Sequence, residues 1–182
     1  MPGIIQAVFI DRDGTIGGSG NVVYPGEFRL FPSADTALLQ LKKAGKLLFS
    51  FTNQPGISMG KASLEEFQKE LTGFGFVQIY LCPHQHTYGC TCRKPSIGML
   101  LQAVDENGLN LKQCVVIGDR WTDMVAAEQA DCINILVKTG AGAEALKKYE
   151  NKEFFALWGE VALDYAAADL LEAVEWLNSN YK

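Results

Sequence analysis

Short apolar runs recur along the chain, and polar or turn-forming residues follow each of them. These runs occupy residues 7–10, 47–51, 77–81, 114–117 and 133–137. Runs of this length are typical of buried strands. Several of the stretches between them carry apolar residues three or four positions apart, which is the spacing of one helix face. Strands that alternate with helices predict a parallel sheet covered on both faces.

Residues that favour helix ends give these helices their expected limits. Ser33 can cap a helix that stops at Gly45. Ser63 and Glu66 have the spacing of a capping box. The positions expected to face the core in the helix that follows are Leu64, Phe67 and Leu71. Further helices are expected at about 96–107, in a short segment that ends at Ala130, and from Asp169 through Leu177.

The order of these elements predicts a three-layer, doubly wound α/β sheet of the Rossmann-like type. A short edge strand at Val161–Leu163 would complete the sheet. With 182 residues and 48% hydrophobic content, the chain is long enough for one good core. It contains no internal repeat and no linker, so residues 1–182 are predicted to form a single domain.

Charge and terminal sequence exclude some classes of partner. The net charge is -5, whereas a broad nucleic-acid surface needs a basic stripe. No apolar run approaches the length of a membrane span, and the first residues do not resemble a leader peptide. We therefore expect a cytoplasmic protein without nucleic-acid or membrane partners. A small anionic substrate is compatible with this charge if one cleft holds local cations or a metal.

Two carboxylates follow the first strand directly. Asp11 and Asp13 are separated by one residue, and Gly14 marks the turn. In a parallel sheet, the carboxyl ends of the strands form the edge where ligands bind. Residues two apart in an extended chain face the same side, where two negative charges repel unless a cation joins them. Mg²⁺ is the expected cation, because it prefers carboxylate and carbonyl oxygens.

Other predicted strand ends carry polar groups that can join this pair. They are Thr52, Asn53, Asp119 and Asp123, and Lys94 follows a further segment. Such a set suits phosphoryl transfer through an aspartyl-phosphate, with Asp11 as nucleophile and Asp13 as acid and then base. Thr52 and Lys94 would bind the phosphoryl oxygens.

The metal would have three ligands in this scheme. They are Asp11, Asp119 and the main-chain carbonyl of Asp13. Asp123 is expected to hold Lys94 or a metal-bound water. Taken singly, these residue types also serve as turns, caps or surface charges. It is the placement of the whole set at successive strand ends that favours an enzyme.

Four residues between 82 and 92 form a candidate zinc site. Cys82, Cys90 and Cys92 supply thiols and His84 or His86 an imidazole, enough for a closed tetrahedral Zn²⁺ centre with a structural role. Such a centre would fix the loop that carries the next two residues, Arg93 and Lys94. The remaining cysteines, Cys114 and Cys132, lie in apolar segments and are expected to be buried core thiols.

Residues 5 to about 140 resemble the haloacid dehalogenase (HAD) superfamily of phosphatases. The resemblance is carried by Asp11-Arg12-Asp13-Gly14-Thr15, Thr52-Asn53, Lys94 and Gly118-Asp119 with Asp123. It implies a HAD-type fold of the capless subfamily, because neither Asp13 nor Thr52 precedes an insertion large enough for a cap domain. A compact capless domain is expected to be a monomer. Gly17–Asn21 forms either a gating loop or a plain connector.

Within this subfamily, the Cys-x-His and Cys-x-Cys-Arg-Lys-Pro segments resemble the heptose-bisphosphate and histidinol-phosphate phosphatases. That resemblance implies a structural zinc on Cys82, His84, Cys90 and Cys92. It also implies substrate contacts by Asn53 and Arg93, and Arg120 is a further anion-binding candidate. The short zinc loop favours the histidinol group. The segments after Thr52 and Lys94 favour the heptose group, so a small phosphorylated sugar is the preferred substrate and histidinol phosphate the alternative.

Proteins of other classes remain as alternatives. A phosphotransferase would share the aspartyl-phosphate but would have to exclude water, which usually requires a cap domain. A phosphate-binding or regulatory protein without turnover would not need the complete set of Asp11, Asp13, Thr52, Lys94 and Asp119. A nucleic-acid 3'-phosphatase of similar fold is disfavoured by the acidic charge balance.

Overall fold

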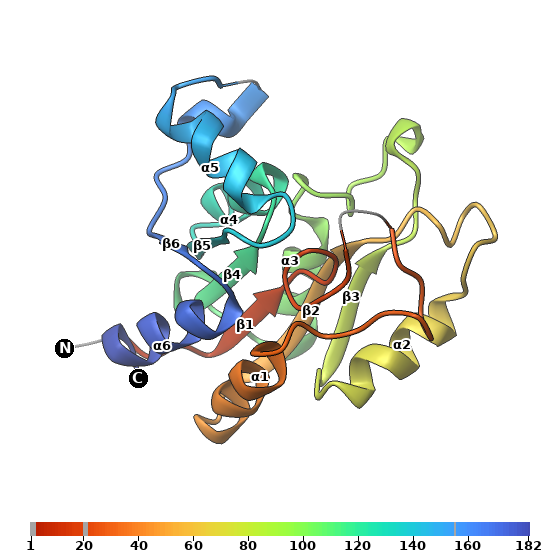
Figure 1. Ribbon diagram of the computed structural model, residues 1–182, viewed down its shortest axis with the longest axis horizontal. Helices are drawn as coiled ribbons and strands as arrows, with labels where there is room; N and C mark the ends of the chain where they lie inside the picture. Colours follow the sequence, from red (N-terminus) through yellow and green to blue (C-terminus); the bar gives the residue numbers. More distant parts are fainter. Residues whose placement is uncertain (1–2, 20–21, 155) are drawn as a thin grey trace.

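The computed structural model describes residues 3–19, 22–154 and 156–182 (Figure 1). Its centre is a sheet whose paired strands are all parallel, in the order β3-β2-β1-β4-β5-β6. The strands are β1 (Ala7–Ile10), β2 (Leu47–Asn53), β3 (Gln78–Cys82), β4 (Cys114–Gly118), β5 (Ile133–Val137) and β6 (Tyr165–Ala167). This order is that of a doubly wound sheet, so the predicted fold class is confirmed.

Helices cover both faces of the sheet. They are α1 (Ala34–Lys43), α2 (Leu64–Gly73), α3 (Gly98–Asn107), α4 (Trp121–Gln129), α5 (Gly142–Glu150) and α6 (Leu170–Asn180). One apolar cluster joins the sheet to α1 and α6, and a second joins it to α3, α4 and the 3-10 turn at 156–160. The two clusters are the two cores of a three-layer architecture.

Strand β1 shows why the apolar runs are continuous. Val8 and Ile10 pack into one cluster, whereas Ala7 and Phe9 pack into the other. All four side chains are fully buried. A strand covered on both faces needs apolar residues at every position rather than at alternate ones.

The two strands at the centre of the sheet create the position for a site. β1 pairs with β2 on one side and with β4 on the other. From β1 the chain continues to β2 and β3 on one side of the sheet, and from β4 it continues to β5 and β6 on the other. This reversal leaves a crevice beyond the carboxyl ends of β1 and β4. In Figure 1, α5 and the loop of residues 82–92 rise on either side of this edge.

Several details differ from the sequence-based predictions. The edge strand lies at Tyr165–Ala167 rather than at Val161–Leu163, because Val161 buries its side chain in the cluster around Trp158. Helix α5 was not expected; among its own residues only Gly142 is fully buried, and Ala145, Leu146 and Tyr149 pack against the second cluster while staying partly exposed. β2 runs two residues further than the apolar pattern, so Thr52 and Asn53 belong to the strand itself.

Two expected helix features also differ. Leu64 is 43% exposed and lies outside the core, whereas Phe67 and Leu71 are buried as predicted. Ser33 makes no side-chain cap to α1; its Oγ instead donates to Asp169 Oδ2 at 3.1 Å. The capping box of Ser63 and Glu66 is present, and Asp169 caps α6.

Two further expectations concern cysteines and loops. Cys114 and Cys132 are buried, as the sequence predicts for core thiols. In the predicted loop Gly17–Asn21, Gly20 and Asn21 lie outside the described residues. Among the described residues, no helix has the length and apolar character needed to cross a membrane.

Candidate active site

The site is built around the carboxyl ends of β1 and β4. Asp11 directly follows β1, and its backbone N–H donates to the carbonyl oxygen of Ile117 on β4 at 3.0 Å. Asp119 directly follows β4. Both residues are buried, with 4% and 1% of their surface exposed. The pairing of two neighbouring strands thus brings together residues that are far apart in the sequence.

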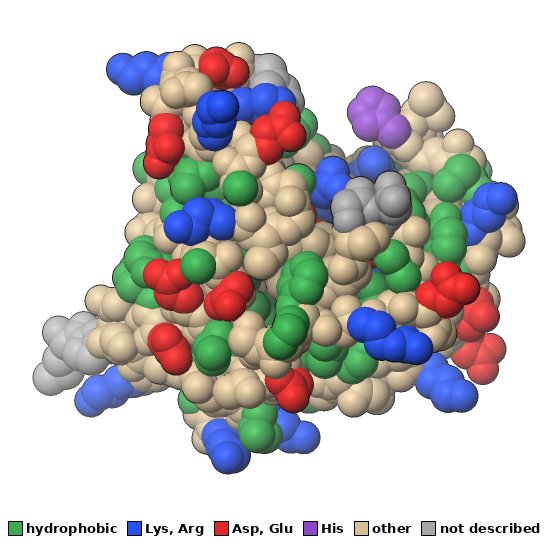
Figure 2. Space-filling view, in the orientation of Figure 1, with side chains coloured by type: hydrophobic (Ala, Val, Ile, Leu, Met, Phe, Trp, Pro, Cys, Tyr) green, Lys and Arg blue, Asp and Glu red, His purple; other side chains and the backbone are tan. Residues whose placement is uncertain are grey.

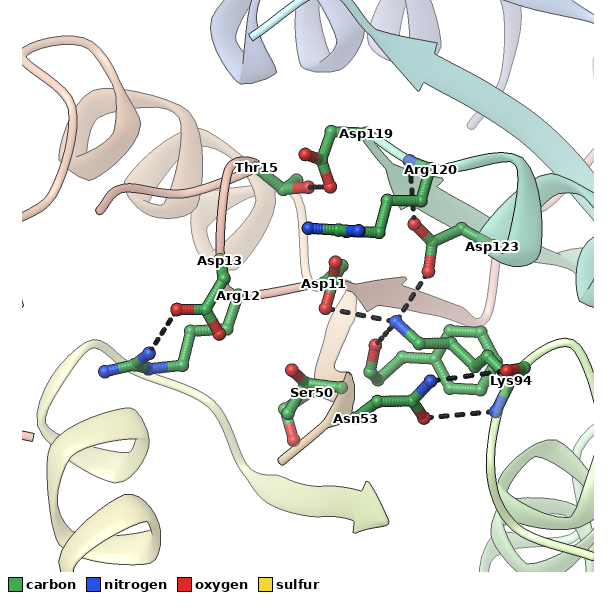
Figure 3. A network of polar contacts seen from close by, with 12 residues as sticks. Asp11, Arg12, Asp13, Thr15, Ser50, Asn53, Lys94, Asp119, Arg120 and Asp123 are labelled. Carbon is green, nitrogen blue, oxygen red and sulfur yellow. Dashed lines mark hydrogen bonds and ion pairs between the residues drawn. The ribbon is translucent and has the colours of Figure 1, made fainter. Parts of the chain in front are cut away.

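Lys94 reaches this pair from the turn before α3. Its Nζ lies 3.0 Å from Asp11 Oδ1 and 2.5 Å from Asp123 Oδ1, and it also donates to the carbonyl oxygen of Phe51. Burial lowers the pKa of Lys94, but the Asp11 and Asp123 carboxylates outweigh burial, so the pKa is raised. The ammonium group is therefore a permanent buried cation beside Asp11 (Figure 3).

Asp123 links this lysine to helix α4. Its Oδ1 contacts Lys94, and its Oδ2 accepts a hydrogen bond from the backbone N–H of Arg120 at 3.1 Å. Asp123 is completely buried. Burial raises its pKa to about 6 against the lowering effect of Lys94. The contact with Lys94 is one of the two positions expected for Asp123.

Asp119 is held by donors on two loops. Oδ1 accepts from Thr15 Oγ1 at 3.3 Å, and Oδ2 accepts from the backbone N–H of Ala141 at 2.8 Å. Burial, reinforced by Asp11 and Asp123, raises its pKa to about 7. A desolvated carboxylate beside other carboxylates is a position that favours a bound cation.

Glycines leave the space that Asp119 needs. Gly14 and Gly140 both have positive φ angles, +82° and +54°. A Cβ atom on either would lie 2.2 Å from Asp119 Oδ2. Neither position can therefore carry a side chain without moving the carboxylate.

The acidic residues of this edge fit a divalent cation. Asp11, Asp119 and Asp123 each bring one carboxylate oxygen to within 4.8 Å of the others. Hard oxygen donors in a buried cluster are the ligands that Mg²⁺ takes in proteins. Asp123 is paired with the Lys94 cation at 2.5 Å, whereas the donors to Asp119, Thr15 Oγ1 and the Ala141 N–H, are uncharged, so Asp119 is better able than Asp123 to bind the ion.

Asp13 lies beside this cluster but is held by different partners. Its Oδ1 accepts from Arg12 Nη1 at 2.7 Å, and its Oδ2 accepts from Gln54 Nε2 at 2.6 Å. Burial raises the pKa of Asp13, and Arg12 opposes this increase. Gln54 also donates to Thr52 Oγ1 at 3.0 Å. Arg12 and Gln54 were missed by sequence reasoning, although each adjoins a predicted site residue.

These groups open onto a pocket of about 340 Å³. Figure 2 shows the hollow in this face of the molecule, with Lys and Arg side chains inside it. The predicted site residues among its lining are Asp11, Asp13, Thr52, Asn53, Arg93, Lys94 and Arg120. Asp119 lines a smaller cavity next to the first, and Asp13 and Arg120 line both.

The three predicted substrate-binding residues take different positions in this pocket. The Asn53 amide is engaged on both sides with the backbone of Lys94, as donor at 3.3 Å and acceptor at 3.0 Å. Arg93 donates to the carbonyl oxygen of His84 at 3.2 Å. The guanidinium group of Arg120 extends above Asp11 in Figure 3.

The predicted zinc residues are brought together by the 82–92 loop. Cys92 Sγ lies 3.1 Å from Cys82 Sγ, 3.5 Å from Cys90 Sγ and 3.2 Å from His84 Nδ1. The four ligand atoms all lie within 4.8 Å of one another. The competing His86 is exposed and lines the pocket instead. Three thiols and one imidazole at this spacing fit a closed Zn²⁺ centre.

A doubly wound sheet with an aspartate pair, a buried lysine and an acidic cluster at its switch point defines a phosphoryl-transfer enzyme of the HAD type. The family model described as haloacid dehalogenase-like hydrolase matches residues 19–131, and a HAD-hydrolase-like model matches residues 91–173. The chain belongs to the haloacid dehalogenase-like hydrolase family.

Relatives within this family carry more specific names. D-glycero-beta-D-manno-heptose-1,7-bisphosphate 7-phosphatase of Pasteurella multocida (strain Pm70) is 39% identical over 154 residues, which cover 74% of this chain and 83% of the relative. The enzyme of that name from Yersinia pestis is 31% identical over 197 residues and covers 98% of both chains. These comparisons confirm the prediction of a phosphatase of this family.

A solved structure shows the same architecture. The crystal structure of D,D-heptose 1,7-bisphosphate phosphatase from B. bronchiseptica, complexed with magnesium and phosphate, superposes with a TM-score of 0.80. It is 27% identical, and the match covers 96% of this chain and 99% of the other. A magnesium-dependent reaction is therefore consistent with the acidic cluster of this chain.

Proposed function

We propose that this protein is a Mg²⁺-dependent phosphatase of carbohydrate metabolism that removes one phosphate from a heptose 1,7-bisphosphate or a closely similar sugar phosphate. The observation that carries the proposal is the contact of Lys94 with Asp11, because it places a buried cation beside a carboxylate in a pocket. The names of the relatives support the choice of sugar.

The residues present can perform the two steps of such a reaction. In the first step, an oxygen of Asp11 attacks phosphorus, the bond to the sugar oxygen breaks, and protonated Asp13 transfers its proton to that oxygen. In the second step, Asp13 takes a proton from water as the water oxygen attacks phosphorus. The bond between phosphorus and the Asp11 oxygen breaks, so phosphate is released and Asp11 is restored. Lys94 and Thr52 stabilise the charge on the phosphoryl oxygens through both steps.

Magnesium and zinc have separate tasks in this proposal. Asp11, Asp119 and the main-chain carbonyl of Asp13 would hold Mg²⁺, which when bound neutralises phosphoryl charge and orients the phosphate. Cys82, His84, Cys90 and Cys92 would hold Zn²⁺, which takes no part in the reaction. The zinc would fix the segment that presents Arg93 and Lys94 to the pocket.

Two arginines support a substrate with a second phosphate. Arg93 and Arg120 line the same pocket as Lys94 and are more exposed than it is. Guanidinium groups bind phosphate through paired hydrogen bonds. One phosphate would react beside Asp11 while these arginines bind the other end of the sugar.

Phosphate release from a substrate panel tests the proposal. The panel contains the heptose 1,7-bisphosphate, other sugar bisphosphates, histidinol phosphate and 4-nitrophenyl phosphate, each with and without Mg²⁺. We expect the highest kcat/KM with the heptose substrate and loss of turnover in Asp11→Asn. Mg²⁺-dependent turnover by a clean Asp11→Asn preparation would reject the nucleophile. Wild-type protein that releases no phosphate from any of them would reject the function.

Histidinol phosphate is the second candidate substrate. The feature that favours it is the short segment between His84 and Cys90, which leaves little chain to enclose a larger sugar. A kcat/KM for histidinol phosphate above that for the heptose would replace the first proposal and keep the mechanism. The cytoplasmic location, the monomeric state and the single domain over 1–182 remain predictions.

A further inference from the structure

Arg12 is a buried arginine between the two aspartates that follow β1. Its guanidinium carbon lies 3.7 Å from the centre of the Phe28 ring and 4.9 Å from that of Phe67. Its Nε donates to Glu70 Oε1 on α2 at 2.7 Å. The side chain is fully buried. Two rings and one carboxylate thus fix the guanidinium plane in a single orientation.

The fixed guanidinium group holds Asp13. Its Nη1 donates to Asp13 Oδ1 at 2.7 Å and to the carbonyl oxygen of Val23 at 2.8 Å. The other carboxylate oxygen of Asp13 accepts from Gln54. Figure 3 shows the carboxylate turned toward Arg12, beside Asp11. Because each oxygen has its own donor, the carboxylate keeps one orientation at the pocket.

A buried arginine of this kind is a costly way to stabilise a fold. Within the part of the chain that the structure describes, Arg12 Nη2 has no hydrogen-bond partner. An unused buried donor keeps its desolvation cost. Apolar residues of similar volume are often at least as stabilising as a buried ion pair. The contact with Asp13 explains the arginine better than stability does.

We propose that Arg12 is a positioning residue for the acid and base of the reaction, and that Glu70 of α2 holds Arg12 in place. This inference rests on the proposed function, in which Asp13 gives a proton to the leaving oxygen and later takes one from water. Proton transfer requires the carboxylate to lie within hydrogen-bond reach of each oxygen. Without Arg12, only Gln54 holds the Asp13 carboxylate, which can then turn out of position, and both transfers become slower.

The test compares Arg12→Met in a Glu70→Gln background with Glu70→Gln alone. Methionine can fill the space between the two rings, and glutamine removes a carboxylate that would otherwise be buried without its partner. Glu70→Gln keeps an acceptor oxygen for Arg12 Nε, so it is the matched control. Arg12→Lys is a second variant, which keeps the charge but not the forked contact with Asp13 and Glu70.

Two substrates separate positioning from structural damage. The alkoxide of a heptose 1,7-bisphosphate needs a proton to leave, whereas 4-nitrophenolate does not. In both Arg12 variants we expect kcat for the heptose to fall about 100-fold, the cost of a misplacement near 1 Å, with KM unchanged. The first turnover of 4-nitrophenyl phosphate keeps its wild-type rate. It releases a burst of 4-nitrophenolate equal to the enzyme concentration, because the later hydrolysis of the aspartyl-phosphate needs Asp13 and becomes slower. Glu70→Gln alone keeps only a neutral acceptor for Arg12, so we expect a smaller fall in kcat for the heptose, and the effect of Arg12→Met is measured relative to it.

Two results would overturn the inference. One is an equal loss of the first-turnover rate with both substrates in the Arg12 variants, which indicates general damage to the site. The other is wild-type turnover of the heptose substrate by both Arg12 variants. Wild-type protein in the same assay tests the proposed function by itself, so a failure of the function and a failure of this inference give different results.

Discussion

Lys94 and Asp123 form an ion pair in which both side chains are almost completely buried, with 2.5 Å between Nζ and Oδ1. The second oxygen of Asp123 accepts from the backbone at the start of α4. The lysine is therefore tied to a helix terminus on one side while it contacts Asp11 on the other. Its place in the site therefore depends in part on an aspartate that does not itself line the pocket.

Removing this aspartate should affect stability and activity together. Breaking a buried pair leaves an uncompensated charge, so Asp123→Ala should lower the free energy of unfolding by about 3 kcal/mol and reduce kcat. Asp123→Asn keeps the shape and should cost less stability. Urea denaturation and phosphate release measure the two effects. Asp105→Ala, at an exposed carboxylate of α3, is the control. An Asp123→Ala protein as stable as this control would contradict the prediction.

Stability in the absence of metal should depend on pH through Asp119. Burial raises its pKa to about 7 in the folded protein, above the ordinary 3.8. The folded state then binds this proton more tightly than the unfolded state, so the stabilisation is complete below about pH 4 and is lost as pH rises to about 7. We expect Mg²⁺, when bound as proposed, to take the place of the proton and to restore the stability at higher pH.

Differential scanning measurements check this pH dependence. The increase in Tm on adding Mg²⁺ should be larger at about pH 8 than at about pH 5. Asp119→Asn removes the charge, so it should raise the Tm of the metal-free protein at the higher pH and abolish the response to Mg²⁺. An equal Mg²⁺ response at both pH values in the wild type would show that Asp119 does not control it.

Zinc should be present and should act through structure alone. Cys92 contacts the other three predicted ligands, so Cys92→Ser should lose the metal. We expect one zinc per chain in the wild type by elemental analysis, and a lower Tm and lower kcat without it. Cys132→Ala changes a buried cysteine outside the cluster and should keep its zinc. Carefully purified wild-type protein that is fully active and free of zinc would refute the ligand set.

Asn53 should affect kcat more than KM. Its side-chain amide forms hydrogen bonds with both the backbone N–H and the carbonyl oxygen of Lys94. Losing two hydrogen bonds of about 1 kcal/mol each in Asn53→Ala should displace the lysine, so we expect kcat to fall by about 10-fold or more. Steady-state kinetics with the heptose substrate measures both constants. A higher KM with unchanged kcat would instead support the substrate contact that the family resemblance implies.

Much of the fold could be predicted because its signals are local. Runs such as 7–10 and 114–117 are apolar at every position, and only a strand buried on both faces requires that. Helix α5 escaped prediction for the opposite reason, since Gly142 is its only fully buried residue and the apolar side formed by Ala145, Leu146 and Tyr149 is short and partly exposed. The edge strand at Tyr165–Ala167 is set by its pairing with Ile135–Val137, which is a tertiary contact.

The candidate site divides in a similar way. Asp11, Asp119 and Lys94 could be found from the sequence because each follows an apolar segment or a metal-ligand pattern. Asp123 is a partner of Lys94 that the sequence already suggested, with a metal-bound water as its alternative. Other partners that fix these residues could not be found, because those contacts join distant parts of the chain. Thr15 reaches Asp119 across 104 positions, and Arg12 reaches Glu70 across 58.

The sequence by itself determined the α/β class, the strand ends that carry reactive groups, and the family. These features repeat along the chain with a local period or spacing, so they can be recognised without coordinates. Only the tertiary structure decided that Asp123 holds Lys94, that Arg12 holds Asp13, and that two glycines leave space for Asp119. Such contacts depend on which strands pair and how their loops pack, and neither leaves a periodic signal in the sequence.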